Sequence, residues 1–281
     1  MTSLFLLLSR WPLGALHALG AVLGWLVFLA SPTYRRRFLD HAAQAGYRFA
    51  QVRAAVAHAG RMVAELPRLW FGRPVPVRWD GAEHIEAALA AGRGLLFLTP
   101  HLGCFEVTAQ AYAARFAPVH GPITVLFRPA RKAALREVVA RSRARAGLAA
   151  APATLAGVKQ LLKALRAGHA VGLLPDQVPP QGLGVWAPFF GRPAYTMTLA
   201  ARLARQSGAA LLLAWGERLP RAAGYVVHVE PFNAPLSADA TEAAAQINAA
   251  METLIRRCPE QYLWAYARYK TPREELRHDD A

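Results

Sequence analysis

A histidine and a glutamate five residues apart, His101 and Glu106, are the side chains of this sequence whose types and spacing most directly suggest chemistry. A neutral imidazole accepts a proton near pH 7, and a carboxylate on its other nitrogen fixes the tautomer. On one helix, about 100° per residue would put the two side chains roughly 140° apart. They can meet if His101 lies in a loop and Glu106 in the next helix. The residue types fit a purely structural interpretation equally well, in which the histidine caps the sheet and the glutamate stabilises a helix N-terminus.

The apolar segment 94–100 predicts a buried strand that ends just before His101. Segments 123–129 and 169–175 have the same character, and helical patterns lie between them. This alternation predicts an α/β fold with a mixed, largely parallel sheet covered by helices on both faces. A short turn joins two further strands, which we expect to pair antiparallel. Those strands are 209–219 and 225–232, the expected helices are 38–70, 82–92, 104–116, 131–147, 155–168, 196–208 and 241–258, and 176–195 is expected to be a loop.

Polar residues follow all three of the buried strands. His101 follows the first, Arg128 ends the second, and Asp176 with Gln177 follows the third. Ligands of open α/β sheets bind outside the carboxyl ends of the strands. Any one of these residues is more often a solvated loop residue, but three such strand ends favour a site.

The two cysteines do not indicate a metal site or a disulfide framework. Cys104 follows His101 by three residues, which is a poor geometry for a Cys–His nucleophile. We therefore expect no metal, no covalent intermediate on Cys104 and a reducing compartment. We also expect no cofactor, since the glycines form neither a P-loop nor a dinucleotide-binding fingerprint.

The charge of the chain indicates anionic partners. Of 281 residues, 54% are hydrophobic and 18% charged, and the net charge is +15, mostly from arginine. Arginine binds phosphates and carboxylates through a rigid fork. Nucleic acid, anionic lipid, phosphorylated sugar and an acidic carrier protein all fit, although a genome rich in arginine explains part of the excess.

The N-terminal region carries an uncharged segment, 11–30, long enough to cross a bilayer, and the basic stretch 34–38 follows it. Basic residues beside an apolar helix tend to stay in the cytoplasm. A cleaved signal peptide is disfavoured because the first basic residue is Arg10. We expect an N-terminal membrane-associated helix over 1–30 and a catalytic domain over 31–281. Spanning and interfacial arrangements both stay open, since a proline and three glycines interrupt the segment.

Three segments carry a resemblance to a known family. The stretch PHLGCFE resembles the H-x4-D/E motif of glycerolipid-type acyltransferases. The longer segments 174–198 (LPDQVPPQGLGVWAPFFGRPAYTMT) and 259–270 (PEQYLWAYARYK) resemble the late acyltransferases of lipid A biosynthesis. The similarity covers roughly residues 10–272, and the two longer segments are the specific ones.

The resemblance implies a glycerolipid-acyltransferase-like fold and an enzyme of the bacterial inner membrane that faces the cytoplasm. It would move a fatty acyl chain from acyl carrier protein to a hydroxyl of a lipid A precursor or related glycolipid. His101 would be the general base and Glu106 its partner. The implied substrate-binding positions are Arg128, Arg143, Arg145, Asp176, Gln177 and Arg192. The segment after Arg128 lacks the family's usual Asn-Pro, which leaves the register toward Arg143 open by a few residues.

Two other functions remain. One is a glycerophospholipid or ornithine-lipid O-acyltransferase that uses the same histidine and glutamate; the segment 176–198 argues against it. The other is a basic membrane- or nucleic-acid-binding protein without catalysis, but no nucleic-acid motif is present. The sequence leaves the acyl length and the acceptor position undetermined.

Overall fold

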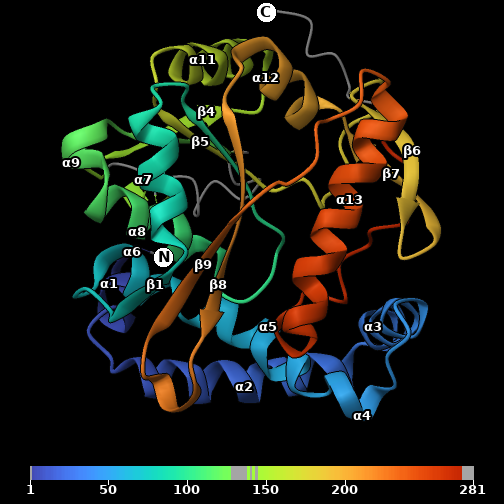
Figure 1. Cartoon of the computed structure of the whole chain (residues 1–281). Helices are drawn as coiled ribbons and strands as arrows, with labels where there is room; N and C mark the ends of the chain where they lie inside the picture. Colours follow the sequence, from blue (N-terminus) through green and yellow to red (C-terminus); the bar gives the residue numbers. More distant parts are fainter. Residues whose placement is uncertain (1, 128–137, 140, 143–144, 274–281) are drawn as a thin grey trace, which may run out of the picture.

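A computed structural model describes residues 2–127, 138–139, 141–142 and 145–273. Its centre is a seven-stranded sheet with the order β1-β9-β8-β2-β5-β3-β4 (Figure 1). The strands are β1 Val77–Asp80, β2 Leu95–Leu98, β3 Ile123–Phe127, β4 Leu148–Pro152, β5 Ala170–Leu173, β8 Ala210–Arg218 and β9 Tyr225–Pro231. Strands β8, β2, β5, β3 and β4 run parallel, and β9 pairs antiparallel with β8. The predicted mixed, largely parallel sheet is confirmed.

Strand β2 shows why helices cover both faces. Its residues point alternately to the two sides, so Leu96 and Leu98 enter one core and Leu95 and Phe97 the other. Burying each such side chain stabilises the fold by about 1.5–3 kcal/mol relative to leaving it exposed. The first core includes α11 Leu155–Arg166, α12 Leu199–Ser207 and α13 Ala240–Arg257, and the second includes α7 Ala82–Ala90 and α8 Phe105–Arg115, followed by α9 Ala117–His120.

The single helix expected over 38–70 is four shorter helices. They are α3 Pro32–Gln44, α4 Phe49–Val52, α5 Ala54–Ala64 and α6 Leu66–Phe71. Gly46, with φ of +88°, follows α3 in a left-handed conformation that ends a helix. Pro67 occupies the first turn of α6, where a missing N–H costs nothing.

The loop expected over 176–195 was wrong in its second half. There the chain forms a hairpin of β6 Gly184–Phe189 and β7 Arg192–Met197. Its two turn residues, Phe190 and Gly191, both have positive φ, as a tight two-residue hairpin turn requires. The strands were not predicted because this segment is rich in proline and glycine, which usually indicate a loop. The short edge strands β1 and β4 were also not anticipated.

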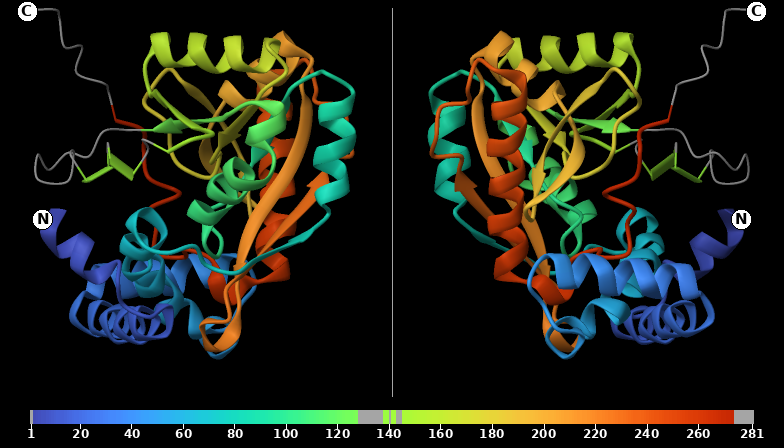
Figure 2. Two further views of the ribbon diagram at one scale, coloured as in Figure 1. Left: turned by 90° about the vertical axis from the view of Figure 1, so that its left-hand side faces the viewer. Right: turned by 90° about the vertical axis from the view of Figure 1, so that its right-hand side faces the viewer.

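The N-terminal segment forms α1 Thr2–Leu8 and α2 Leu13–Ala30. Helix α2 is long and apolar enough to cross a bilayer by composition, yet it packs along α5. Gly20 and Gly24 permit the contact, since a Cβ on Gly24 would lie 2.3 Å from the Val56 carbonyl oxygen. Figures 1 and 2 show α2 lying along one end of the molecule. The basic helix expected over 131–147 falls mostly outside the described residues.

Candidate active site

The loop that carries His101 is fixed from two sides. Gly103 donates its N–H to the Gln261 carbonyl at 3.0 Å, and Cys104 donates to the Gly216 carbonyl at 2.7 Å. Gly103 has φ of +59°, and a Cβ there would lie 2.0 Å from the Gly216 oxygen, so a side chain does not fit. Strand β8 and the C-terminal tail therefore hold His101 at the carboxyl edge of the sheet.

Asp176 is the carboxylate that binds His101. It follows β5, which neighbours β2, and it is 2% exposed. One of its oxygens lies 2.7 Å from His101 Nδ1, and the other accepts the His101 backbone N–H at 2.8 Å. Burial raises the pKa of Asp176, but the charge and hydrogen bonds of His101 outweigh burial and hold that pKa below its ordinary value. An ionised Asp176 keeps the ring proton on Nδ1 and leaves a lone pair on Nε2.

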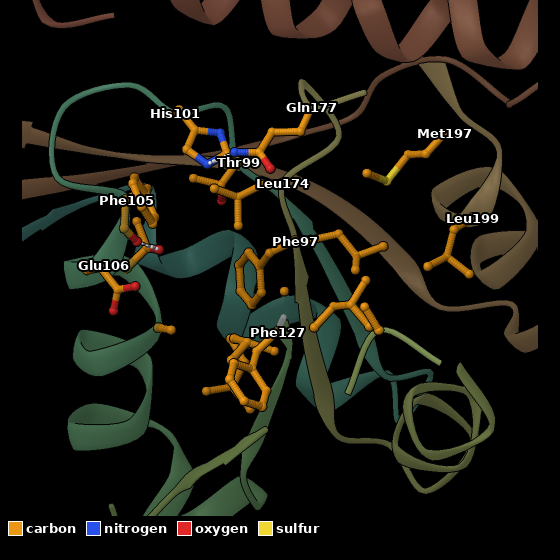
Figure 3. A pocket seen from close by; sticks show the side chains of 18 of the residues that line it. Phe97, Thr99, His101, Phe105, Glu106, Phe127, Leu174, Gln177, Met197 and Leu199 are labelled. Atoms are coloured by element: carbon orange, nitrogen blue, oxygen red, sulfur yellow. Dashed lines mark hydrogen bonds between the residues drawn. The ribbon is translucent and has the colours of Figure 1, made fainter. Parts of the chain in front are cut away.

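Gln177 approaches the other nitrogen of the same ring. Its side-chain nitrogen lies 2.9 Å from His101 Nε2. The three sequence candidates His101, Asp176 and Gln177 are thus brought together, as Figure 3 shows for the histidine and the glutamine.

The expected hydrogen bond between His101 and Glu106 is not formed in this structure. Glu106 accepts instead from the Trp70 indole N–H at 3.2 Å. The phase of α8 explains the difference: Phe105 packs its ring 4.7 Å from the imidazole centroid, and the next residue points about 100° further around the helix. Glu106 nevertheless lines the same cavity as His101 (Figure 3).

The arginine candidates are distributed differently. Arg145 donates to the Trp70 carbonyl at 2.7 Å and to the Gln110 side chain at 3.0 Å, next to Glu106. Burial lowers the pKa of Arg145, and the nearby Glu106 charge opposes that shift. Arg192 stacks on Tyr269, 4.6 Å from its ring centroid, apart from the cavity. Arg128 and Arg143 lie outside the described residues.

An apolar cavity of about 740 Å³ opens beside His101. Figure 3 shows His101 and Gln177 on one side of it and Phe97 and Phe127 on another. Its apolar walls come from α8, the sheet, the loop after β5 and α12, and they include Trp79, Phe97, Ala109, Tyr112, Val125, Phe127, Leu174, Val178, Leu199 and Val227. The cavity can hold a long apolar ligand with its head at the imidazole.

The C-terminal tail supports the site in a way that residue types did not reveal. Tyr262 lies with its hydroxyl 3.4 Å from Asp176, and Gln261 accepts the Arg218 backbone N–H at 2.9 Å. The buried Arg268 donates to the Tyr195 carbonyl and to Thr196, both at 2.7 Å. The resemblance of segment 259–270 to the family was the sequence signal for this support, but it did not indicate what the individual residues of the segment do.

A buried ion pair lies behind the His101 loop. Arg218 donates to Glu65 at 2.6 and 2.8 Å and to the Gly103 carbonyl at 3.1 Å. His17 of α2 lies 2.9 Å from the same carboxylate. Cys104 is buried beside this pair, and burial raises the pKa of its thiol, which disfavours a nucleophilic role. Within the described ranges, no three His, Cys, Asp or Glu side chains gather in a way that could hold a metal ion.

The fold and the site define an α/β protein with a carboxylate-bound histidine at the sheet's carboxyl edge, open to an apolar cavity. Residues 5–271 match the model of the bacterial lipid A biosynthesis acyltransferases. The chain belongs to this family and is an acyltransferase.

Curated relatives agree with this assignment. The lipid A biosynthesis palmitoleoyltransferase of Escherichia coli (strain K12) is 29% identical over 75% of this chain and 69% of its own length. The lauroyltransferase of the same organism is 30% identical over 75% of this chain and 68% of its own. A lipid A biosynthesis acyltransferase of Haemophilus influenzae is 25% identical over 69% of this chain and 59% of its own.

Proposed function

We propose that this acyltransferase moves a fatty acyl chain from acyl carrier protein to a hydroxyl of a lipid A precursor, with His101 as the general base. The observation that carries the proposal is the position of His101, which Asp176 holds at an apolar cavity of about 740 Å³. An acyl chain fills such a cavity favourably, at about 0.8 kcal/mol per buried CH₂. Its thioester then lies beside the imidazole.

The reaction needs one base and one leaving group. His101 Nε2 takes the proton of the acceptor hydroxyl, and the oxygen attacks the thioester carbonyl carbon. The C–S bond then breaks, and the sulfur leaves with the proton from the imidazolium. Asp176 stabilises that imidazolium while it exists, because its carboxylate is buried and already bound to Nδ1.

Glu106 keeps its proposed catalytic role, without a direct bond to His101. It is 8% exposed and lines the cavity within the first turn of α8. From that position its negative charge can favour the imidazolium or orient the acceptor hydroxyl. Arg145, which the Trp70 carbonyl and Gln110 fix near Glu106, is a candidate for anionic substrate groups.

The proposed partners follow from charge. A net charge of +15 favours an acidic carrier protein and a phosphorylated glycolipid. Arg202 lines the cavity, where its guanidinium can bind an anionic group of a substrate. Nucleic acid is not among the proposed partners.

The proposed location is the cytoplasmic face of the bacterial inner membrane. The outer face of α2 is apolar and exposed; it consists of Leu19, Val22, Leu23, Leu26, Val27 and Leu29. The inner face binds α5, where Arg61 approaches the His17 carbonyl at 3.4 Å. If α2 spanned the bilayer in this arrangement, α5 would enter it with a charged arginine, which is costly. We therefore propose that α2 lies flat in the membrane surface rather than spanning it.

The decisive experiment compares lipid A by mass spectrometry from a host with and without this chain. We expect a mass difference of one acyl group, whose size reports the chain length. Lipid A of equal mass, together with a changed phospholipid or ornithine-lipid profile, would assign the acyl group to another acceptor.

A further inference from the structure

The side chain of Gln177 contacts Nε2 of His101, the nitrogen that must accept a proton in the proposed reaction. Asp176 accepts the Nδ1–H, so Nε2 carries the lone pair that must receive the acceptor's proton. The Gln177 side-chain nitrogen lies 2.9 Å from this Nε2. Of two nitrogens in contact one must donate, and only the amide has hydrogens to give here. In this state the base is hydrogen-bonded and unavailable.

The backbone on both sides of Gln177 is held, so Gln177 can leave Nε2 only by a change of its side-chain rotamer. The residue before it is the buried Asp176, and Val178 donates its N–H to the Tyr266 hydroxyl at 2.9 Å. The chain around Gln177 is therefore held on both sides. Gln177 itself is exposed and lines the cavity, and rotamers of exposed side chains exchange within nanoseconds.

We propose that Gln177 guards the base and makes this enzyme transfer acyl groups rather than hydrolyse its donor. This inference rests on the proposed function. With donor bound and acceptor absent, water is the competing nucleophile. If water reached Nε2, His101 would take its proton, hydroxide would attack the thioester carbonyl, and the C–S bond would break. The products would be a free fatty acid and a thiol, with water consumed.

Gln177 favours transfer over hydrolysis because the acceptor and water differ in the binding energy that they gain from the enzyme. Water must displace the Gln177 amide without help from other contacts. An acceptor glycolipid that is bound at saturation has already displaced the amide, because its further contacts with the enzyme offset the lost hydrogen bond. Its turnover therefore no longer includes that cost. The amide therefore slows hydrolysis more than transfer, by the strength of one hydrogen bond.

The test is Gln177→Ala in the full-length chain, with a dodecanoyl thioester of acyl carrier protein as the probe. Hydrolysis is followed as free thiol without acceptor, and transfer as ester product with a saturating concentration of a lipid A precursor. We expect the ratio of hydrolysis to transfer to rise about 3- to 10-fold, as the loss of one net hydrogen bond predicts. Gln181→Ala is the matched control, since Gln181 is exposed on the same loop and uses its backbone N–H to bind Arg273.

The outcomes separate the guard from the proposed function. If the enzyme transfers to the lipid A precursor and the ratio is the same in Gln177→Ala, Gln181→Ala and the parent chain, the guard is wrong and the function stands. If the enzyme hydrolyses the thioester but never acylates this acceptor, the proposed function is wrong. The hydrolysis rates of the three proteins then still test the guard.

A second variant tests the contact itself. In Gln177→Glu the new carboxylate would accept a hydrogen bond from the protonated Nε2 of His101 and so stabilise the imidazolium. We expect the acid limb of the pH–rate profile to move up by about one pH unit. An unmoved acid limb would contradict a position of residue 177 beside Nε2.

Discussion

Asp176 holds His101 at two points: one carboxylate oxygen lies 2.7 Å from the ring Nδ1, and the other accepts the backbone N–H at 2.8 Å. The two residues are 75 positions apart in the sequence, and they meet because β2 and β5 are parallel neighbours. A carboxylate held so firmly fixes both the tautomer and the direction of the imidazole.

Replacing this carboxylate should impair catalysis more than folding. We expect His101→Ala to abolish transfer and Asp176→Asn to lower kcat by about 10²- to 10⁴-fold, because the asparagine no longer enforces the Nδ1–H tautomer. Steady-state transfer measures this effect, with circular dichroism as a check of the fold. Asp80→Asn is the control, since Asp80 forms a similar contact with His228 at 2.8 Å on the exposed sheet edge. An equal loss in both variants would exclude a special role for Asp176.

Glu106 and Asp176 should have separable effects on pH dependence. We expect Glu106→Gln to lower transfer by at least about tenfold while shifting the acid limb of the pH–rate profile less than Asp176→Asn does. The physical reason is that Glu106 binds the Trp70 indole and not the imidazole. Full pH–rate profiles of both variants provide the measurement. A larger shift in Glu106→Gln would mean that substrate binding brings Glu106 onto His101.

The cavity predicts which chain lengths are accepted. Ala109 of α8 is 9% exposed and lines the cavity, so Ala109→Leu should shorten the space available to the acyl chain. We expect the variant to prefer shorter donors, with discrimination of about tenfold or more per excluded methylene. Competition between thioesters of two lengths measures the preference. Ala87→Leu on the exposed side of α7 should leave it unchanged.

The outer face of α2 predicts how the protein meets a bilayer. Val22 and Leu26 are 58% and 55% exposed, and the double variant Val22→Glu, Leu26→Glu should bind anionic vesicles at least about tenfold more weakly. Val119→Glu, at a site 79% exposed elsewhere, is the control in this sedimentation assay.

Tags at the two termini distinguish a flat helix from a spanning one. If α2 lies in the surface, protease added to one side of sealed vesicles removes N- and C-terminal tags together. Protection of only one tag would show that the helix spans the bilayer.

Acid should destabilise the protein through the buried pair behind the active site. Burial alone would raise the pKa of Glu65, but Arg218 outweighs it and lowers that pKa to about 2. The stability contributed by Glu65 is thus complete above its unfolded value near 4.5 and is lost as pH falls toward 2. Burial, and then the charges of Arg218 and Arg61, lower the pKa of His58 to about 3. Since unfolded His58 binds a proton below about 6.5, stability already declines from that pH downward.

A variant isolates the histidine contribution. As the pH falls from 6.5 to 5, we expect the buried, neutral His58 to lower the free energy of unfolding by roughly 1–2 kcal/mol. In His58→Gln the free energy of unfolding should therefore depend less on pH over this range. Urea unfolding at several pH values gives the slope. The exposed His120→Gln is the control, and equal slopes in the two variants would contradict the assignment.

Much of the architecture could be predicted from local patterns. The apolar segments 94–100, 123–129 and 169–175 became β2, β3 and β5, because buried parallel strands need continuous apolar residues. The hairpin β6–β7 could not be predicted, since its prolines and glycines read locally as loop. Its partner α13 supplies the Asn248 amide to the Pro188 carbonyl at 2.9 Å from 60 residues away.

By itself, the sequence determined the α/β class, the strand ends that carry His101 and Asp176, and the likeness to lipid A acyltransferases. Only the tertiary structure decided which carboxylate binds the imidazole. Glu106 is near in sequence, but the phase of α8 turns it toward Trp70. Asp176 is far in sequence, but strand pairing brings it within 2.7 Å. Sheet neighbours and helix phase depend on long-range packing, and spacing along the chain does not encode either.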